Sequence, residues 1–304
     1  MENINLLLPE IFIALSIMFI LVLGVFKKES SKLVFNISQL ALLITTVIII
    51  NEAFTINRRT LFNDSVVIDH MSSLMKIITL IGTFLILTIS ETYLQTFKLF
   101  KIEYPVLILS SVLGMMVMIS SNDLIVFYMG LELQSLALYV LATFNRDQLQ
   151  SSEAGLKYFV LSALSSGLLL YGCSLIYGFS GSTNFDVISN QLDLNEYVLT
   201  FGIVFIIVGL AFKISAVPFH MWAPDVYQGS PTSVTLFFTM VPKIAALTVF
   251  IRCLYVPFLN LIDQWQMIIV FLSLASMLFG AIAAIGQTNI KRLIAYSSIS
   301  HIGY

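Results

Sequence analysis

Long runs of apolar residues, separated by short polar segments, dominate the hydrophobic pattern of the chain. A helix needs about 20 mostly apolar residues to cross the hydrocarbon core of a bilayer. Nine runs meet this length, at about 4–26, 33–51, 71–92, 104–122, 124–145, 154–179, 197–227, 232–255 and 264–286. A tenth begins near Leu293 and reaches Tyr304, which is too short for a crossing. We therefore expect an all-α polytopic membrane protein with about ten transmembrane helices, the tenth incomplete. Either the natural chain is longer or a second polypeptide continues it.

The composition agrees with this pattern and excludes other classes of protein. Hydrophobic residues make up 58% of the chain and charged residues only 11%, against roughly 25% charged in soluble domains. A water-soluble enzyme needs more charge to cover its surface. The net charge of −2 is too balanced for a nucleic-acid-binding protein. Cys173 and Cys253 lie in apolar runs and indicate neither a disulfide framework nor a metal site. We expect a lipid bilayer around the chain and no nucleic-acid partner.

Lysine and arginine are unevenly distributed between alternate loops. The loops after the odd-numbered runs contain eight of them, and the opposite loops contain two, or three if Arg252 at a helix end is counted. The eight are Lys27, Lys28, Lys32, Lys98, Lys101, Arg146, Lys291 and Arg292. Cytoplasmic loops carry the excess of basic residues in membrane proteins. The N-terminus is therefore predicted to lie on the outer side of the membrane.

Three ionisable residues lie deep inside apolar runs: Glu132, Lys213 and Lys243. A charge at the centre of a membrane helix costs at least ~2.5–3.5 kcal/mol, so such residues usually face a partner or water. Their depth indicates a path for ions or protons. The alternative is a static buried ion pair, because structural pairs are also found in protein interiors.

Other ionisable residues lie closer to helix ends. The long stems of Lys76 and Lys157 can reach the membrane interface from there, so both an interfacial and a buried position are open for them. Glu10 is expected at the interface, and Arg252 is expected to anchor a helix end. The segment 162–167 carries three serines and a glycine that offer a small-residue face for close helix contact.

The seventh run is too long for one straight helix. Its 31 residues would span ~47 Å at 1.5 Å per residue, more than the ~30 Å hydrocarbon core. Pro218 and Pro224 interrupt it, because proline lacks a backbone donor and clashes with the preceding turn. Lys213 stands five residues before Pro218. Broken helices at mid-membrane mark ion and substrate sites, and the C-terminal end of a helix favours an ammonium group.

These residues suggest a proton relay. Burial disfavours the charged form of a lysine, whereas a nearby carboxylate favours it. A Glu132 that moves or changes charge would switch Lys213 between holding and releasing a proton. His220 could extend the relay toward the inside, because histidine titrates near neutral pH. A histidine held by ordinary hydrogen bonds is the alternative, and His301 in the tenth run is a similar candidate. The chain has no P-loop, dinucleotide fingerprint or iron–sulfur cysteine set, so we expect no redox chemistry on it.

Three long segments resemble the proton-pumping, antiporter-like membrane subunits of respiratory complex I, NADH-quinone oxidoreductase. They are SNDLIVFYMGLELQSLALYVL at 121–141, GLAFKISAVPFHMWAPDVYQGSPT at 209–232 and QTNIKRLIAYSSISHIGY at 287–304. Among these subunits, the group called subunit 2 or chain N is the most similar. The resemblance implies a fourteen-helix subunit built of two inverted five-helix repeats, each with a broken helix.

The resemblance also implies a division of the chain and a role for each site residue. Residues 1–102 would form three N-terminal helices, 103–256 the antiporter-like proton-channel repeat, and 257–304 the truncated start of the second repeat. By position, the site residues would be the fifth-helix glutamate, the sixth-helix lysine, the lysine beside the break, the histidine after the break and the eighth-helix lysine. They are Glu132, Lys157, Lys213 with the helix break at Pro218, His220 and Lys243. The second broken helix and its lysine are missing here.

The function that the resemblance implies is proton translocation in the membrane arm of complex I. A relay of Glu, Lys and His residues would couple NADH:ubiquinone electron transfer on other chains to proton pumping. NADH, FMN, iron–sulfur clusters and ubiquinone are expected on those other chains, with no cofactor on this one. The expected partners are other membrane-arm subunits and, if the subunit is split, a second chain that completes it. The expected location is the mitochondrial inner membrane, with the bacterial plasma membrane as the alternative. The rival functions are a subunit of a multichain sodium/proton antiporter and a structural scaffold.

Overall fold

Helices make up most of the computed structural model, which describes residues 4–26, 30–53, 58–190 and 196–304. Each of the ten apolar runs in the sequence corresponds to a helix, and the seventh corresponds to two. These helices are α1 (Leu8–Phe26), α2 (Ser31–Ala53), α3 (His70–Thr96), α4 (Glu103–Ile119), α5 (Leu124–Ala142), α6 (Leu149–Ser180), α8 (Glu196–Ile214), α9 (Trp222–Gly229), α10 (Thr232–Tyr255), α11 (Ile262–Ile285) and α12 (Ile290–Gly303).

Short elements connect the long helices. A 3₁₀ turn, η1 (Ile4–Leu7), leads into α1, and another, η3 (Leu259–Leu261), leads into α11. Strands β1 (Arg59–Leu61) and β2 (Val66–Ile68) pair in an antiparallel hairpin with Thr60 opposite Val67. The short helix α7 (Phe185–Asn190) follows α6.

The fold class predicted from the sequence is confirmed. Within the described residues, seven helices are long and apolar enough to cross a membrane, and α4 and the part 199–214 of α8 are shorter apolar helices. The number of membrane crossings and the domain boundaries at 102 and 256 stay predictions.

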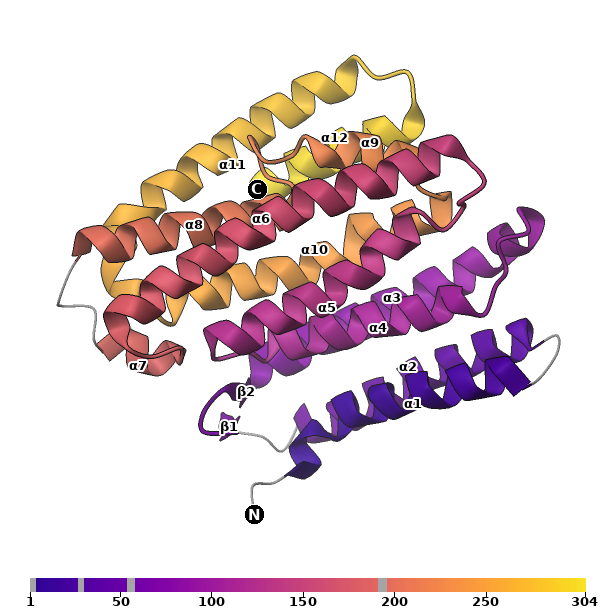
Figure 1. The fold of residues 1–304 in the computed structure, drawn as a ribbon, viewed down its shortest axis with the longest axis horizontal. Coiled ribbons are helices and arrows are strands. Elements are labelled where there is room, and N and C mark those ends of the chain that lie inside the picture. Colours follow the sequence, from indigo (N-terminus) through magenta and orange to yellow (C-terminus); the bar gives the residue numbers. More distant parts are fainter. Residues whose placement is uncertain (1–3, 27–29, 54–57, 191–195) are drawn as a thin grey trace.

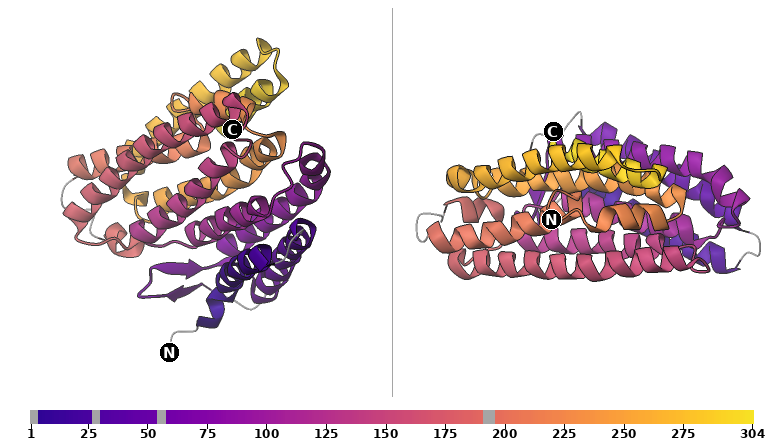
Figure 2. Two further views of the ribbon diagram at one scale, coloured as in Figure 1. Left: turned by 45° about the vertical axis from the view of Figure 1, so that its right-hand side comes forward. Right: turned by 90° about the horizontal axis from the view of Figure 1, so that it is seen from above.

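The long helices lie side by side in one bundle (Figure 1). Helices α1 and α2 form one edge and α11 forms the opposite edge, in Figure 1 and in the left view of Figure 2. The connections α3–α4, α5–α6 and α11–α12 gather at one end, which we call the basic end because Lys98, Lys101 and Arg146 lie in them. The β1–β2 hairpin and α7 lie at the other, the hairpin end. The sequence predicts that the loops after the odd-numbered runs carry most of the basic residues and lie on one side, and these three connections agree with it. Lys27 and Lys28, which belong to the same prediction, lie outside the described residues.

Two glycines bring α4 and α5 into close contact. A Cβ atom on Gly114 would lie 2.4 Å from the backbone nitrogen of Gln134, and one on Gly130 would lie 2.7 Å from the backbone nitrogen of Met118. Only residues without a side chain allow two helix backbones to approach this closely. The contact fixes the segment of α5 that carries Glu132.

A buried ion pair ties α10 to the start of α3 at the hairpin end. Arg252 donates to Asp69 Oδ1 at 2.8 Å and Oδ2 at 2.9 Å, and its side chain is only 4% exposed. Asp69 also caps α3, because its side chain accepts a hydrogen bond from the backbone amide of Ser72. Burial raises the pKa of Asp69, but Arg252 and these hydrogen bonds outweigh it, so the pKa lies below its ordinary value. Arg252 thus anchors a helix end through a partner that the sequence did not indicate.

The substitution Asp69→Asn is expected to lower the free energy of unfolding by about 2 kcal/mol, because it leaves the buried Arg252 without a charged partner, whereas asparagine can still cap α3. The thermal unfolding midpoint of the purified protein at neutral pH measures this loss. In the wild type, a lowered pKa means that the contribution is present at neutral pH and is lost as the pH falls through that lowered pKa. Asp186→Asn is the control, because Asp186 pairs with Arg58 at 3.0 Å on the exposed surface. Equal losses in the two variants would contradict the expectation.

Candidate proton-transfer site

The seventh helix is broken where the sequence predicts it. Helix α8 ends at Ile214, and the chain passes through Ser215 with φ +61° and a cis Val217–Pro218 peptide before α9 begins at Trp222. Pro218 lies in the break, as expected. Pro224, in contrast, lies in the first turn of α9 and does not interrupt it, because the amides of a first helical turn have no partner within the helix.

Side chains satisfy backbone groups at the break. The Val217 amide donates to Ser276 Oγ of α11 at 2.9 Å, and Trp222 Nε1 donates to the Phe212 carbonyl at 2.9 Å. Irregular backbone is tolerated at membrane depth only where protein or water provides such partners. The break is therefore an ordered part of the bundle.

Lys213 lies in the last turn of α8, next to the break, with its side chain 6% exposed. Its Nζ donates to Ser135 Oγ of α5 at 2.7 Å and to Ser162 Oγ of α6 at 2.8 Å. Glu132 Oε1 is 4.0 Å away. The structure thus brings the predicted glutamate and lysine together, but hydroxyl groups are the direct partners of the ammonium.

Glu132 is not held as tightly as a static ion pair requires. Its Oε1 is buried and accepts no hydrogen bond from the described residues, and its side chain is 23% exposed. Charge-assisted hydrogen bonds between an ammonium and a carboxylate are normally about 2.7–2.9 Å long. The 4.0 Å separation favours a pair that can rearrange over a fixed one.

One face of α5 supplies the surroundings of Lys213. Glu132, Ser135 and Tyr139 follow one another at spacings of three and four residues, which places them on the same side of a helix. Tyr139 donates its hydroxyl to Ser162 Oγ at 2.6 Å, and its ring centroid lies 6.0 Å from Lys213 Nζ. Ser162 thus links α5, α6 and α8 at one point.

Lys243 is the second buried lysine, on α10. Its Nζ donates to Ser215 Oγ at 2.9 Å and to Ser298 Oγ of α12, and it lies 5.6 Å from the ring centroid of Tyr227. Ser215 is the first residue of the helix break, only two positions after Lys213. The break therefore joins the surroundings of the two lysines.

A cavity of about 390 Å³ lies beside Lys243 between α10 and α12. Thr239, Ser297, Ser298 and His301 contribute polar groups to its wall. A cavity of this volume has room for several water molecules, and the polar groups can hold them. His301, the second histidine that the sequence offered as a relay candidate, lines the same cavity as Lys243.

His220 lies in the break but apart from the two lysines. In the described part of the chain it makes no hydrogen bond or ion pair to Lys213 or Lys243, and its buried Nδ1 has no partner. Its ring packs edge-on against Phe279 of α11 with centroids 4.7 Å apart. A role for His220 in proton transfer stays a prediction.

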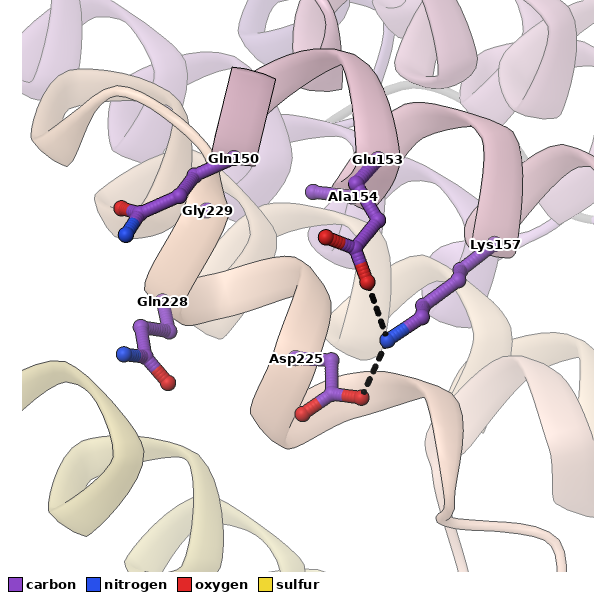
Figure 3. Close-up of a pocket in the computed structure, with 7 residues that line it drawn as sticks. All are labelled: Gln150, Glu153, Ala154, Lys157, Asp225, Gln228 and Gly229. Carbon is purple, nitrogen blue, oxygen red and sulfur yellow. Dashed lines mark hydrogen bonds and ion pairs between the residues drawn. The ribbon is translucent and has the colours of Figure 1, made fainter. Parts of the chain in front are cut away.

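Lys157 lies at the basic end, and its side chain is more exposed than those of Lys213 and Lys243. Figure 3 shows its ammonium between Glu153 Oε1, at 2.8 Å, and Asp225 Oδ2 of α9, at 3.0 Å, in a pocket of about 190 Å³. Its side chain is 41% exposed. Arg292 of α12 binds the other oxygen of Asp225 at 2.8 Å. The structure thus gives Lys157 an exposed position in a charged cluster, and its place in a relay stays a prediction.

Lys76 of α3 and Glu10 of α1 form a buried ion pair. Lys76 Nζ donates to Glu10 Oε1 at 2.5 Å, and the side chains are 4% and 9% exposed. Helix α2 packs against both α1 and α3, and the pair is buried inside the bundle. The expected position of Glu10 at the membrane interface stays a prediction.

The sequence did not single out the serines that bind the lysines. Ser162 belongs to the small-residue face of α6, whereas Ser135, Ser215 and Ser298 had no signal beyond being polar residues in or next to apolar runs. The pairing of Glu153 with Lys157 could have been found, because their i, i+4 spacing is the usual one for ion pairs on a helix.

Named proteins match the chain along nearly its whole length. NADH-quinone oxidoreductase subunit N of Pelagibacter ubique (strain HTCC1062) is 72% identical over 100% of this chain and 64% of its own length. The subunit of the same name from Bartonella bacilliformis is 53% identical over 98% of this chain and 63% of its own length. A chain of respiratory complex I from Thermus thermophilus with bound aureothin has a TM-score of 0.83 at 30% identity, over 97% of this chain and 62% of that one. This chain spans slightly less than two thirds of each.

These relatives are bacterial proteins. The expected mitochondrial inner membrane is therefore not supported, and the alternative, the bacterial plasma membrane, fits.

The family model described as NADH:quinone oxidoreductase/Mrp antiporter, TM matches residues 121–304. The match covers more than half of the chain and includes Glu132, Lys213, the helix break and Lys243. It confirms the resemblance that the three sequence segments indicated. The chain belongs to the NADH:quinone oxidoreductase/Mrp antiporter transmembrane family.

Proposed function

We propose that this chain acts as a proton-translocating subunit in the membrane arm of a bacterial respiratory complex I. The observation that carries the proposal is the position of Lys213, a buried ammonium at a broken helix whose direct partners are two hydroxyl groups. Neutral partners stabilise an ammonium less than a close carboxylate does. The proton on Lys213 is therefore held weakly enough to be passed on when Glu132 changes its position or its charge.

The geometry offers a route for that proton. Ser162 and Ser135 contact Lys213, and a hydroxyl can accept one proton while it donates another. Ser215, at the break, contacts Lys243, which lines the polar cavity that also contains His301. We propose that Glu132 controls the proton on Lys213, and that water molecules join Lys213 to Lys243 and then to this cavity.

The name of the relatives favours complex I over a sodium/proton antiporter. They are NADH-quinone oxidoreductase subunits N, with identities of 72% and 53%. In this proposal, NADH, FMN, iron–sulfur clusters and ubiquinone bind to other chains, and this chain contributes no redox step. Its partners would be other membrane-arm subunits of the complex.

The substitution Glu132→Gln tests the proposal against a scaffold role. It keeps the shape of the side chain and removes its charge, so we expect several-fold fewer protons translocated per NADH oxidised, with the complex still assembled. The measurement uses sealed membrane vesicles that contain the whole complex, with sodium replaced by potassium. Glu103→Gln is the control, because Glu103 is an exposed carboxylate at the start of α4. Unchanged pumping by Glu132→Gln would support a scaffold, and pumping only in sodium would support an antiporter.

A further inference from the structure

A groove of about 440 Å³ runs between α3, α10 and α12 toward the basic end of the bundle. Both α3 and α12 contact α10. Each of the three helices contributes an exposed apolar side chain to its wall: Ile89 from α3, Leu236 from α10 and Ile294 from α12. Ligand pockets in proteins are mostly apolar and carry a few polar groups that fix the orientation of the ligand. The polar groups of this groove therefore indicate what it can bind.

Lys291 is the only charged residue among the described residues that line the groove. It lies at the start of α12 and is half-buried. Its Nζ donates to the Ser230 carbonyl at 2.8 Å and to the Gln228 carbonyl at 3.4 Å. The neighbouring Arg292 binds the carboxylate of Asp225, whereas Lys291 has no ion pair in the described part of the chain. An ammonium group has three donors, so one donor of this unpaired cation is still free.

Further polar groups of the groove have no partner either. Ser90 of α3 and Ser233 of α10 are 2% and 4% exposed, and neither hydroxyl has a hydrogen-bond partner among the described residues. Buried polar atoms are normally hydrogen-bonded to protein, water or a ligand. Helix α10 also begins here without a side-chain cap at Pro231, and the start of a helix carries a partial positive charge.

The charge of the groove and its place in the bundle favour an anionic lipid. A free cation and unpaired hydroxyls lie along a wall that is otherwise apolar, so the groove fits a molecule with an anionic head and a hydrocarbon chain. In the predicted orientation the basic end faces the cytoplasm, and Lys98, Lys101 and Arg146 lie at the same end. Basic pockets between membrane helices on the cytoplasmic side bind the head groups of anionic lipids.

We propose that this groove binds one anionic phospholipid of the cytoplasmic leaflet. Its phosphate would contact Lys291 at the start of α12, and one acyl chain would lie along Ile89, Leu236 and Ile294. The groove shares Thr239 and Ile294 with the wall of the cavity beside Lys243, so the alternative occupant is water. The proposal rests on the groove alone and holds whether or not the chain translocates protons.

Photoactivated lipid labelling of the whole complex tests the proposal. The complex is placed in phosphatidylcholine nanodiscs with a small fraction of phosphatidylglycerol that carries a diazirine in its acyl chain. After illumination, mass spectrometry of peptides locates the label. We expect peptides that contain Ile89, Leu236 or Ile294 to be labelled several-fold more than by a phosphatidylcholine probe with the same diazirine. Equal labelling by the two probes, or no label from either, would overturn the proposal.

Variants of the lysine assign this preference to its charge. Lys291→Gln should remove the preference for phosphatidylglycerol, and Lys291→Arg should keep it, because arginine retains the cation. Lys101→Gln is the matched control, since Lys101 is exposed at the same end and does not line the groove. An unchanged preference in Lys291→Gln would overturn the proposal.

Two further points keep the test decisive. If Lys291→Gln does not assemble, the comparison of the two probes in the wild type decides by itself. Excess inorganic phosphate should leave the labelling unchanged, because the acyl chain contributes to binding. Loss of the label in phosphate would indicate a site for the free anion and would overturn the proposal.

Discussion

Lys213→Met is expected to lower proton translocation coupled to NADH oxidation by at least about tenfold, because positioned acid–base groups contribute this much or more to proton transfer. Methionine has a similar length but neither charge nor proton. It leaves the hydrogen bond from Tyr139 to Ser162 in place, so the contact between α5 and α6 is retained. The measurement is the number of protons moved per NADH oxidised in sealed vesicles that contain the whole complex.

Lys101→Met is the matched control for this substitution. Lys101 is exposed at the basic end of the bundle, and its replacement removes the same charge while Lys213 and Lys243 stay in place. The control should pump like the wild type. Normal pumping by Lys213→Met would remove this lysine from the mechanism, and a loss of assembled complex in both variants would show that the effect is one of folding.

The parts of the fold that follow from local chemistry could be predicted from the sequence. Each membrane helix needs its own run of apolar residues, so the runs gave the helices. The break followed from Pro218, and the candidate residues followed from the cost of placing Glu132, Lys213 and Lys243 in an apolar run. Each of these properties belongs to a segment by itself and does not depend on its neighbours.

The remaining features depend on which helices are neighbours, and a single sequence does not give this. Glu10 and Lys76 are 66 positions apart, and their pairing required α1 and α3 to meet. Ser135 and Ser162 became partners of Lys213 only because three helices converge on one point. For Lys157, the family resemblance implied a place in the relay, which stays a prediction, and only the packing of α6 against α9 showed that its contacts lie at an exposed end.

Gly114→Val is expected to lower the free energy of unfolding by more than about 3 kcal/mol, the upper range for overpacking a tight contact. A Cβ atom at this position would already lie 2.4 Å from the backbone nitrogen of Gln134. A backbone atom cannot turn away as a side chain can, so α4 and α5 must separate. Because Glu132 is carried on α5 near this contact, the separation also moves it relative to Lys213. The thermal unfolding midpoint and the amount of folded protein in membranes measure the effect.

Gly167→Val is the control that isolates the role of the helix contact. Gly167 lies within α6, and a Cβ atom there would have nothing within 4 Å. The two substitutions change helix propensity by the same small amount, roughly a few tenths of a kcal/mol, so the difference between them measures the close approach of α4 and α5. Similar stability of the two variants would show that the two helices can move apart at little cost. In that case the glycine contact would not determine the position of Glu132, and the electrostatic interaction between Glu132 and Lys213 would have to hold α5 in place.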